Sequence, residues 1–178
     1  MLQPSAPPQK WNGQSIVLVG LMGVGKSTVG RRLAARLKLP FVDADEEIES
    51  AADLSIAEIF ERYGEPHFRD GERRVIARLI DGTPKVVATG GGAFVNEDTR
   101  ALILREALAI WLDADLPVLA DRVRRRDTRP LLRGKDPLQV LGDLARVRNP
   151  LYAQAHLRIA SQGGPHDATV QAILEAIR

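Results

Sequence analysis

Residues Gly20–Thr28 read G-L-M-G-V-G-K-S-T and contain the phosphate-binding pattern G-x-x-x-x-G-K-[S/T]. Glycines let the backbone curl so that successive N–H groups point at a phosphate, and the helix expected next adds the positive end of its dipole. Lys26 would reach the terminal phosphates, and the Ser27 hydroxyl would bind Mg²⁺. A plain strand-to-helix turn can also contain glycines, but the flanking strand and helix patterns favour a phosphate loop. The loop predicts a bound nucleoside triphosphate and leaves the phosphate acceptor open.

Two carboxylates, Asp43 and Asp45, follow a second apolar run. In an extended strand they would face the same side, where they could hold Mg²⁺ or accept a proton from a hydroxyl. A solvated strand end is the alternative, but a phosphate loop in the same chain favours function. The run Ala109–Asp113 also ends in an acid. We prefer Asp43 to Asp113 for the metal, because Asp43 is paired with Asp45.

Two further groups follow along the chain. Arg69 could bind a substrate carboxylate as a bidentate fork, with Glu72 within helical reach of it. Considered alone, this pair is better interpreted as a surface ion pair. The glycines Gly90–Gly92 directly follow an expected strand, and their entropic cost favours a place where a ligand approaches the backbone. A flexible connection is the alternative there.

The segment from Arg122 to Lys135 holds seven basic residues and one acidic residue, Asp127. Phosphoryl transfer needs positive charge and exclusion of water, which a mobile arginine-bearing lid would supply. A solvated basic helix end, or a contact with nucleic acid, is the alternative. No aromatic residue lies between Trp111 and Tyr152 to stack on bases. The three histidines, which are His67, His156 and His166, show no metal-binding spacing, so we expect them at the surface or in packing.

The composition sets further limits. The chain has 178 residues and a net charge of +2, with 44% hydrophobic residues, 27% charged residues and no cysteine. Disulfides, thiolate metal sites and a cysteine nucleophile are therefore excluded. No apolar run approaches the length that spans a bilayer, and a general nucleic-acid binder would carry more charge. We expect a cytoplasmic protein with no membrane or nucleic-acid partner. Residues 1–14 hold three prolines and are expected to form a flexible extension.

Strand and helix patterns alternate along the chain. The expected strands are Ile16–Val19, Phe41–Asp45, Val86–Thr89, Leu108–Leu112 and Leu157–Ala160. The expected helices are Val29–Leu37, Glu46–Ser50, Ser55–Gly64, Glu65 or Pro66 to Leu79, Asn96–Glu106, Leu116–Arg125, Asp136–His156 with an interruption near Asn149–Pro150, and Asp167–Arg178. This alternation predicts a parallel sheet covered on both faces, in a three-layer α/β domain. Ligands of such sheets bind beyond the carboxyl ends of the strands, where the groups above are expected.

Taken together and in this order, the motifs resemble those of the shikimate kinase family. They are G-L-M-G-V-G-K-S-T at 20–28, F-V-D-A-D at 41–45, Phe68-Arg69 with Glu72, G-G-G-A at 90–93, R-P-L-L at 129–132 and R-N-P-L-Y at 148–152. The resemblance extends from about Ser15 to the C-terminus. It implies one P-loop kinase domain over 15–178, an α/β/α sandwich with a five-stranded parallel sheet in the order 2-3-1-4-5. It also implies a mobile lid near 122–135 and a monomer.

The implied activity is ATP-dependent phosphorylation of the shikimate 3-hydroxyl, a step of chorismate and aromatic amino-acid biosynthesis. The resemblance implies catalytic roles for Asp45, Lys26 and Arg129, with Asp45 orienting the hydroxyl or acting as its base. The implied ATP-binding residues are Gly23, Val24, Gly25, Lys26, Ser27, Thr28, Arg122, Arg129 and Pro165. The implied shikimate-binding residues are Asp45, Arg69, Gly91, Gly92 and Arg148, with Glu72 orienting Arg69. Ser27 and Asp43 would hold Mg²⁺. The loop Ser161–Pro165 departs from the family in lacking the basic residue often found near adenine.

Two other functions are compatible with the phosphate loop. A related small-molecule kinase, such as a gluconate kinase or a nucleoside monophosphate kinase, would share the loop and the lid. It should not need the motifs around Arg69, Gly90–Gly92 and Arg148. A nucleotide-binding module without phosphotransfer is disfavoured, because the residues that the transfer would use are all present: Lys26, Asp43, Asp45, Arg69 and Arg129. The guanine-specifying pattern N-K-x-D is absent from the sequence.

Overall fold

Five parallel strands form a single sheet in the computed structural model, which describes residues 10–125, 134–161 and 163–178. The strands are β1 (Ile16–Val19), β2 (Phe41–Asp43), β3 (Val86–Ala88), β4 (Leu108–Asp113) and β5 (Leu157–Ala160). Their order is β2-β3-β1-β4-β5, with every neighbouring pair parallel. The fold class and strand order predicted from the sequence are therefore confirmed.

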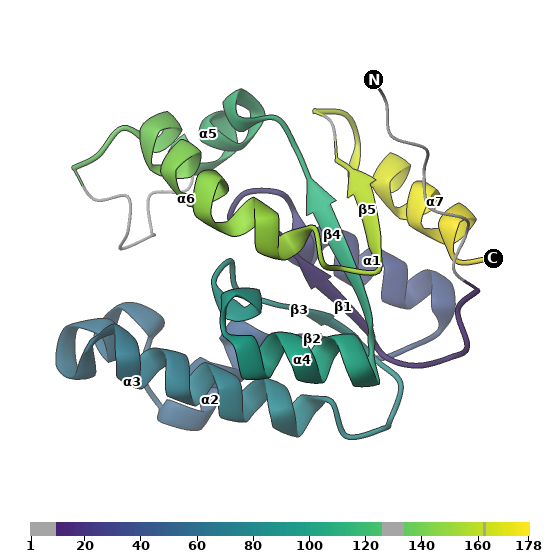
Figure 1. Cartoon of the computed structure of the whole chain (residues 1–178), viewed down its shortest axis with the longest axis horizontal. Helices are drawn as coiled ribbons and strands as arrows, with labels where there is room; N and C mark the ends of the chain where they lie inside the picture. The colour runs from purple at the N-terminus through teal and green to yellow at the C-terminus, as the bar shows by residue number, and fades with distance from the viewer. Residues whose placement is uncertain (1–9, 126–133, 162) are drawn as a thin grey trace.

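Helices cover both faces of this sheet (Figure 1). They are α1 (Lys26–Leu37), α2 (Ala44–Ala52), α3 (Ile56–Leu79), α4 (Glu97–Glu106), α5 (Leu116–Arg124), α6 (Pro137–Tyr152) and α7 (His166–Ala176), with a 3₁₀ turn η1 at Ala93–Val95. α1 and α7 pack side by side on one face, and α4 and α6 lie on the other. α2 and α3 pack on each other beside the β2 edge. Within the described residues no helix is both long and apolar enough to cross a membrane.

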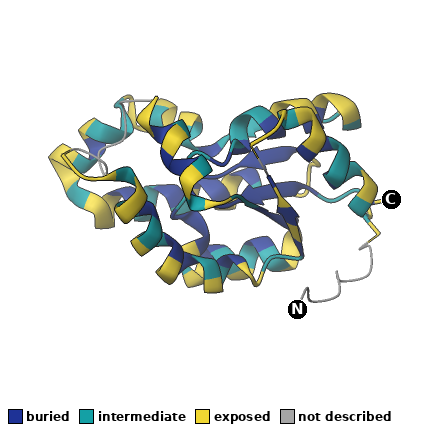
Figure 2. Ribbon diagram, turned by 90° about the horizontal axis from the view of Figure 1, so that it is seen from above, coloured by how far each residue is buried: buried dark blue, intermediate teal, exposed yellow. Residues whose placement is uncertain are grey.

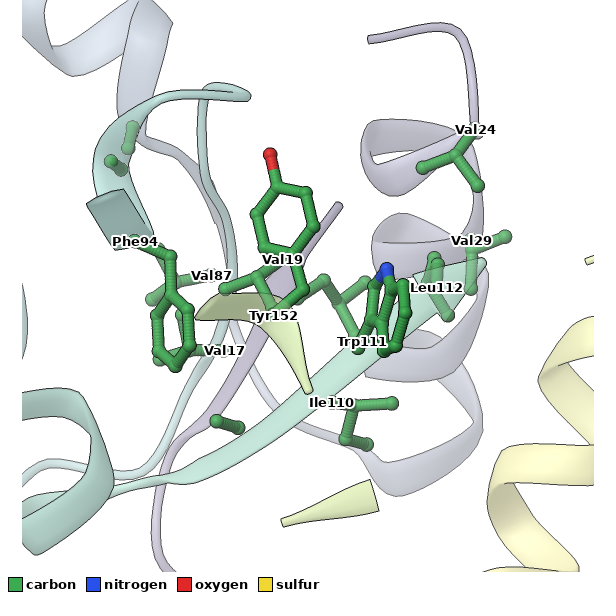
Figure 3. Packing of buried hydrophobic residues seen from close by; sticks show 14 of the residues in the cluster. Val17, Val19, Val24, Val29, Val87, Phe94, Ile110, Trp111, Leu112 and Tyr152 are labelled. Carbon is green, nitrogen blue, oxygen red and sulfur yellow. The ribbon is translucent and has the colours of Figure 1, made fainter. Parts of the chain in front are cut away.

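The central strands are continuous apolar runs, as expected for a sheet buried on both faces. All four residues of β1 are fully buried, and Figure 2 shows burial concentrated in the sheet, with the outer helix faces exposed. Beside the sheet, Tyr152 lies between Phe94 and Trp111 (Figure 3). Its ring centroid is 6.5 Å from that of Phe94 and 5.9 Å from that of Trp111. This aromatic cluster joins α6 to β4 and η1.

The expected helix boundary at Gly64 is present as a kink inside α3. Gly64 has φ 81° and ψ 171°, values that are incompatible with a helix. Ser55 caps the first part of α3, where its hydroxyl accepts a hydrogen bond from the Glu58 N–H at 3.1 Å. The predicted capping residue and the predicted break are both confirmed.

Two local predictions are wrong. β2 ends at Asp43, because the Asp43 side chain caps α2 and accepts hydrogen bonds from the N–H groups of Asp45 (2.9 Å) and Glu46 (3.3 Å). Asp45 thus lies in the first turn of a helix, not on an extended strand beside Asp43. In addition, α6 continues through Pro150 to Tyr152. A proline in the last turn of a helix removes one backbone donor, and the full burial of Tyr152 holds that turn in place.

Candidate active site

The phosphate loop runs from the end of β1 to the start of α1. Gly23 and Gly25 have φ values of 84° and 98°, which favour glycine over residues with a side chain. Lys26 opens α1 and is buried, and its ammonium donates hydrogen bonds to the carbonyls of Gly20 (2.5 Å) and Leu21 (3.1 Å). The lysine therefore lies inside the curl of the loop, where the terminal phosphates of a nucleotide are expected.

Side chains from later elements bond to the carbonyls of the loop. Arg122 of α5 donates to the carbonyls of Gly23 (3.1 Å) and Val24 (3.2 Å). The Ser161 hydroxyl, which follows β5, donates to the Val24 carbonyl at 3.4 Å. With these carbonyls bonded to side chains, the N–H groups of the loop stay available to an anion.

Ser27 and Asp43 bring two oxygen ligands together. The Ser27 hydroxyl donates to Oδ2 of Asp43 at 2.5 Å, while Oδ1 of Asp43 caps α2. Asp113, the other candidate for the metal, lies at the end of β4. Its Oδ2 accepts from the guanidinium of Arg158 on β5, at 3.0 Å from Nε and 2.5 Å from Nη2. The preference for Asp43 over Asp113 is consistent with this geometry.

Two cavities meet at the carboxyl ends of β1, β2 and β3. The phosphate cavity, about 260 Å³, is lined by Gly23, Gly25, Lys26, Ser27, Thr28, Asp43, Asp45, Thr89, Gly90, Gly91, Arg122, Val123, Arg125 and His166. The arginine cavity, about 100 Å³, is lined by Met22, Asp45, Ile56, Phe60, Phe68, Arg69, Glu72, Gly90, Gly91, Gly92 and Arg148. Three residues, Asp45, Gly90 and Gly91, belong to both cavities, so ligands in the two would meet beside Asp45.

The arginine cavity combines two guanidinium groups with one buried carboxylate. Nη1 of Arg69 donates to Oε1 of Glu72 at 3.0 Å, and Arg148 is 8% exposed. Burial raises the pKa of Glu72, although the charge of Arg69 acts in the opposite direction. Within the described residues, Oε2 of Glu72 is buried and accepts no hydrogen bond. The cavity can thus bind a small anion between its arginines and apolar walls.

Polar side chains of the site closely approach the three consecutive glycines. A Cβ atom on Gly90 would lie 2.8 Å from Oδ1 of Asp45. On Gly91 it would lie 3.0 Å from Nη1 of Arg148, and on Gly92 only 2.4 Å from Nη1 of Arg69. Gly90 therefore makes room for Asp45 and Glu72, whose Oε2 would lie 3.2 Å from the Cβ, while Gly91 makes room for Arg148 and Gly92 for Arg69. The sequence predicted a close approach here, but it assigned that approach to the ligand alone.

Tyr152 is a positioning residue to which the sequence reasoning gave no role. Its hydroxyl donates to the Gly91 carbonyl, and burial raises the pKa of Tyr152 to about 12, so it stays a donor at neutral pH. A peptide C=O and the following N–H point in opposite directions, so this bond turns the Gly92 N–H away from Tyr152. Tyr152 lies four residues after Arg148, on the same face of α6. This spacing is the sequence signal that could have identified it.

His166 is the second residue whose position differs from the expectation. It opens α7 and lines the phosphate cavity, although the sequence predicted only a surface or packing role. The other two histidines do act in packing. Nδ1 of His156 accepts from the Ala109 N–H at 2.9 Å, and His67 stacks on Tyr63. The sequence offered one signal for a position in the site, because His166 directly follows Pro165, the expected adenine contact.

Two predicted ATP-binding residues, Val24 and Pro165, line neither cavity. Val24 is buried within the loop, and Pro165 is the exposed residue that precedes α7. Arg129 and the predicted lid residues 126–133 lie outside the described residues. The remaining predicted site residues each line at least one of the two cavities.

The sheet order, the phosphate loop and an adjoining anion cavity define a P-loop kinase. A family model described as shikimate kinase matches residues 22–178. A shikimate kinase of Caulobacter vibrioides is 62% identical over 93% of this chain and 82% of its own length, and one of Zymomonas mobilis is 54% identical over 99% of both chains. The solved shikimate kinase of Acinetobacter baumannii in complex with shikimate has a TM-score of 0.89 and 38% identity, over 93% of both chains. The chain belongs to the shikimate kinase family, as the motifs predicted.

Proposed function

We propose that this chain transfers the γ-phosphoryl group of ATP to the 3-hydroxyl of shikimate, giving 3-phosphoshikimate and ADP on the route to chorismate and the aromatic amino acids. One observation carries the proposal: the phosphate cavity and the arginine cavity share Asp45, Gly90 and Gly91. A donor in one cavity and an acceptor in the other would therefore react beside a single carboxylate.

The donor half binds the triphosphate. Backbone N–H groups of the loop and the start of α1 surround the phosphates, while Lys26 turns from the Gly20 and Leu21 carbonyls toward them. Arg122 lies against the nucleotide from α5. Mg²⁺ fits the adjacent oxygens of Ser27 and Asp43, with phosphate and water oxygens completing its shell, because the described residues hold no cluster of three or more metal-binding side chains. When bound, the ion neutralises phosphate charge.

The acceptor half recognises a small hydroxylated carboxylate. Arg69 and Arg148 bind the carboxylate of shikimate, and Glu72 holds Arg69 in place through the 3.0 Å ion pair. Backbone groups of Gly91 and Gly92 contact the ring substituents, and the side chains of Phe60 and Phe68 cover the apolar part of the ring.

Asp45 performs the chemistry on the acceptor side. Its carboxylate accepts a hydrogen bond from the 3-hydroxyl and points that oxygen at the γ-phosphorus. As the new O–P bond forms and the bond to ADP breaks, the hydroxyl proton passes to Asp45. Lys26 stabilises the charge that develops on the transferred group. Arg129 adds to this stabilisation from the lid and helps to exclude water. We further propose that the protein works as a monomer in the cytoplasm, with no membrane or nucleic-acid partner.

The test is ADP release with ATP and Mg²⁺ across a panel of acceptors that contains shikimate, gluconate and nucleoside monophosphates. Release should require shikimate. Asp45→Asn should lower kcat by at least about a hundredfold while leaving the Kd for ADP nearly unchanged, because the base is lost but the donor half is intact. No release with shikimate, or equal release with gluconate, would overturn the proposal.

A further inference from the structure

A groove of about 460 Å³ lies between α2 and α3, in addition to the two cavities of the active site. Its volume is in the range of pockets that bind small molecules. We call it the α2–α3 groove. Its walls include Ile48 and Ala51 of α2 and Tyr63, His67, Gly71 and Arg74 of α3.

Gly71 widens this groove at a cost to the helix that carries it. It lies in the interior of α3 with a helical backbone, unlike Gly64, and a Cβ atom on Gly71 would have no tertiary contact within 4 Å. Neither the backbone angle nor close packing therefore requires a glycine there, although glycine inside a helix is less stable than alanine. The bare backbone at Gly71 is consistent with a groove that takes up another molecule.

The groove is mostly apolar and carries positive charge. None of the described residues that line it is acidic, and its charged or titratable side chains are Arg74, His67 and Tyr63. Beside the groove, Asp70 pairs with both Arg73 (3.0 Å) and Arg74 (3.1 Å), so two arginines balance one carboxylate. The Tyr63 ring is 56% exposed and stacks on His67 at 4.6 Å. The lining therefore fits a ligand with a flat apolar body and an anionic end.

The spacing of these groups sets the size of the ligand. His67, Gly71 and Arg74 are four and three residues apart, so they share one face of α3. His67 and Arg74 are about 10 Å apart along the helix axis, because each residue adds about 1.5 Å. A phenyl ring joined to a carboxylate by a short carbon chain has a comparable length.

Phe68 connects the groove to the arginine cavity, because its side chain lines both. Its ring lies 4.8 Å from the ring of Phe60 and 5.1 Å from Cζ of Arg69, and both of these residues line the arginine cavity. A ligand that packs on Phe68 from the groove would push this ring against Arg69. The guanidinium that binds the shikimate carboxylate would then be displaced.

We propose that the α2–α3 groove is an effector site for a small aromatic carboxylate, which weakens shikimate binding when it occupies the groove. The aromatic ring packs on His67 and the apolar residues of α2, over the bare backbone of Gly71. The carboxylate pairs with Arg74. The effect on shikimate rests on the proposed function, whereas the binding of the carboxylate does not.

The test uses 3-phenylpropanoate as the probe and measures its binding by calorimetry and its effect on the kinetics. We expect saturable binding of one molecule per chain and a rise of about fivefold in the KM for shikimate, with little change in the KM for ATP. Because such coupling is reciprocal, saturating shikimate should raise the Kd for the probe by the same factor and no further. A Kd that keeps rising with shikimate would show direct competition in the arginine cavity and would overturn the proposal.

Two variants locate the probe. Gly71→Leu fills the groove and should abolish binding, and it should melt no lower than wild type because it removes a glycine from a helix. Arg74→Gln removes the partner of the carboxylate and should raise the Kd for the probe about tenfold. Arg73→Gln is the matched control, since Arg73 pairs with the same Asp70 but does not line the groove. It should bind the probe as wild type does.

The proposal falls if wild type does not bind the probe, if Gly71→Leu binds it equally well, or if the two arginine variants behave alike. Bound probe that leaves the KM for shikimate unchanged would overturn the effector role. A dimer of wild type that Gly71→Leu abolishes would make a second chain the occupant and would also overturn the proposal. If Gly71→Leu does not fold, the comparison of Arg74→Gln with Arg73→Gln decides. Probe binding in the groove of a chain that does not phosphorylate shikimate would overturn the proposed function and leave the ligand site standing.

Discussion

Glu72 offers a test in which stability and substrate binding should move in opposite directions. The side chain is 3% exposed, and one of its oxygens, Oε2, accepts no hydrogen bond within the described residues. Burial raises its pKa, so the folded protein binds this proton more tightly than the unfolded chain does. In the range between the ordinary pKa of a glutamate and the raised value, the folded state carries the extra proton. Stability contributed by this group is therefore lost as the pH rises through that range.

Glu72→Gln removes the charge and keeps the shape of the side chain. At neutral pH the variant should melt no lower than wild type, because the raised pKa of Glu72 means that folding disfavours its charged form. Shikimate binding should weaken, because Arg69 loses its 3.0 Å ion pair. The Arg69 side chain is 23% exposed and keeps a second contact with Glu65 at 3.4 Å. The loss is therefore about 1–2 kcal/mol, or about a 5- to 30-fold rise in the KM for shikimate.

The assay for Glu72→Gln combines thermal melting from about pH 5 to about pH 8 with steady-state kinetics. The melting temperature of the variant relative to wild type should rise with pH, while the Kd for ADP stays constant. Glu65→Gln is the matched control, since it makes the same change at the exposed partner of the same arginine. A variant that melts lower by an equal amount at every pH, with an unchanged KM for shikimate, would refute this reasoning.

Three further substitutions probe other contacts of the site. Gly92→Ala would place a Cβ atom 2.4 Å from Nη1 of Arg69, so we expect the KM for shikimate to rise about tenfold, and an unchanged KM would contradict the tight contact. Tyr152→Phe removes the hydrogen bond to the Gly91 carbonyl and should lower the free energy of unfolding in urea by about 1–2 kcal/mol; a loss within experimental error would argue against it. Asp43→Asn should increase the Mg²⁺ concentration needed for half-maximal rate, whereas Asp113→Asn should not; equal effects would contradict the metal assignment.

Much of the fold could be predicted because the residue pattern of each segment agrees with its place in the whole sheet. Continuous apolar runs such as Ile16–Val19 indicate strands buried on both faces, and the helices between them require parallel connections. The phosphate loop could be predicted for the same reason, since its glycines have the positive φ values that the motif needs. The prediction of a strand that continues to Asp45 was wrong, because the Asp43 side chain caps α2. A carboxylate after a strand can either continue the strand or cap a helix, and the residue types Asp43 and Asp45 do not separate the two outcomes.

The site residues that sequence reasoning missed depend on contacts between distant elements. The role of Tyr152 comes from a carbonyl in the loop after β3, and that of His166 comes from Gly25, far away in the chain. The four-residue spacing on α6 places Tyr152 on the same face as Arg148, but it does not reveal the bond to the Gly91 carbonyl. No helix spacing reveals the contact of His166 with Gly25. The Arg69–Glu72 pair could be predicted as a contact, but not as a buried one, because an exposed pair has the same i,i+3 spacing. Burial decides between the two interpretations, and it follows from how α3 packs on the rest of the chain.

The central claim is that the two cavities bring one hydroxyl of shikimate to the γ-phosphate of ATP beside Asp45. The most direct measurement is phosphorus–proton correlation NMR on the product formed from ATP, Mg²⁺ and shikimate, with the Asp45→Asn protein run in parallel. The wild-type protein should give a single new phosphate ester whose phosphorus couples to the ring proton at carbon 3. A phosphate at another hydroxyl, free phosphate alone, or the same yield from Asp45→Asn would contradict the account.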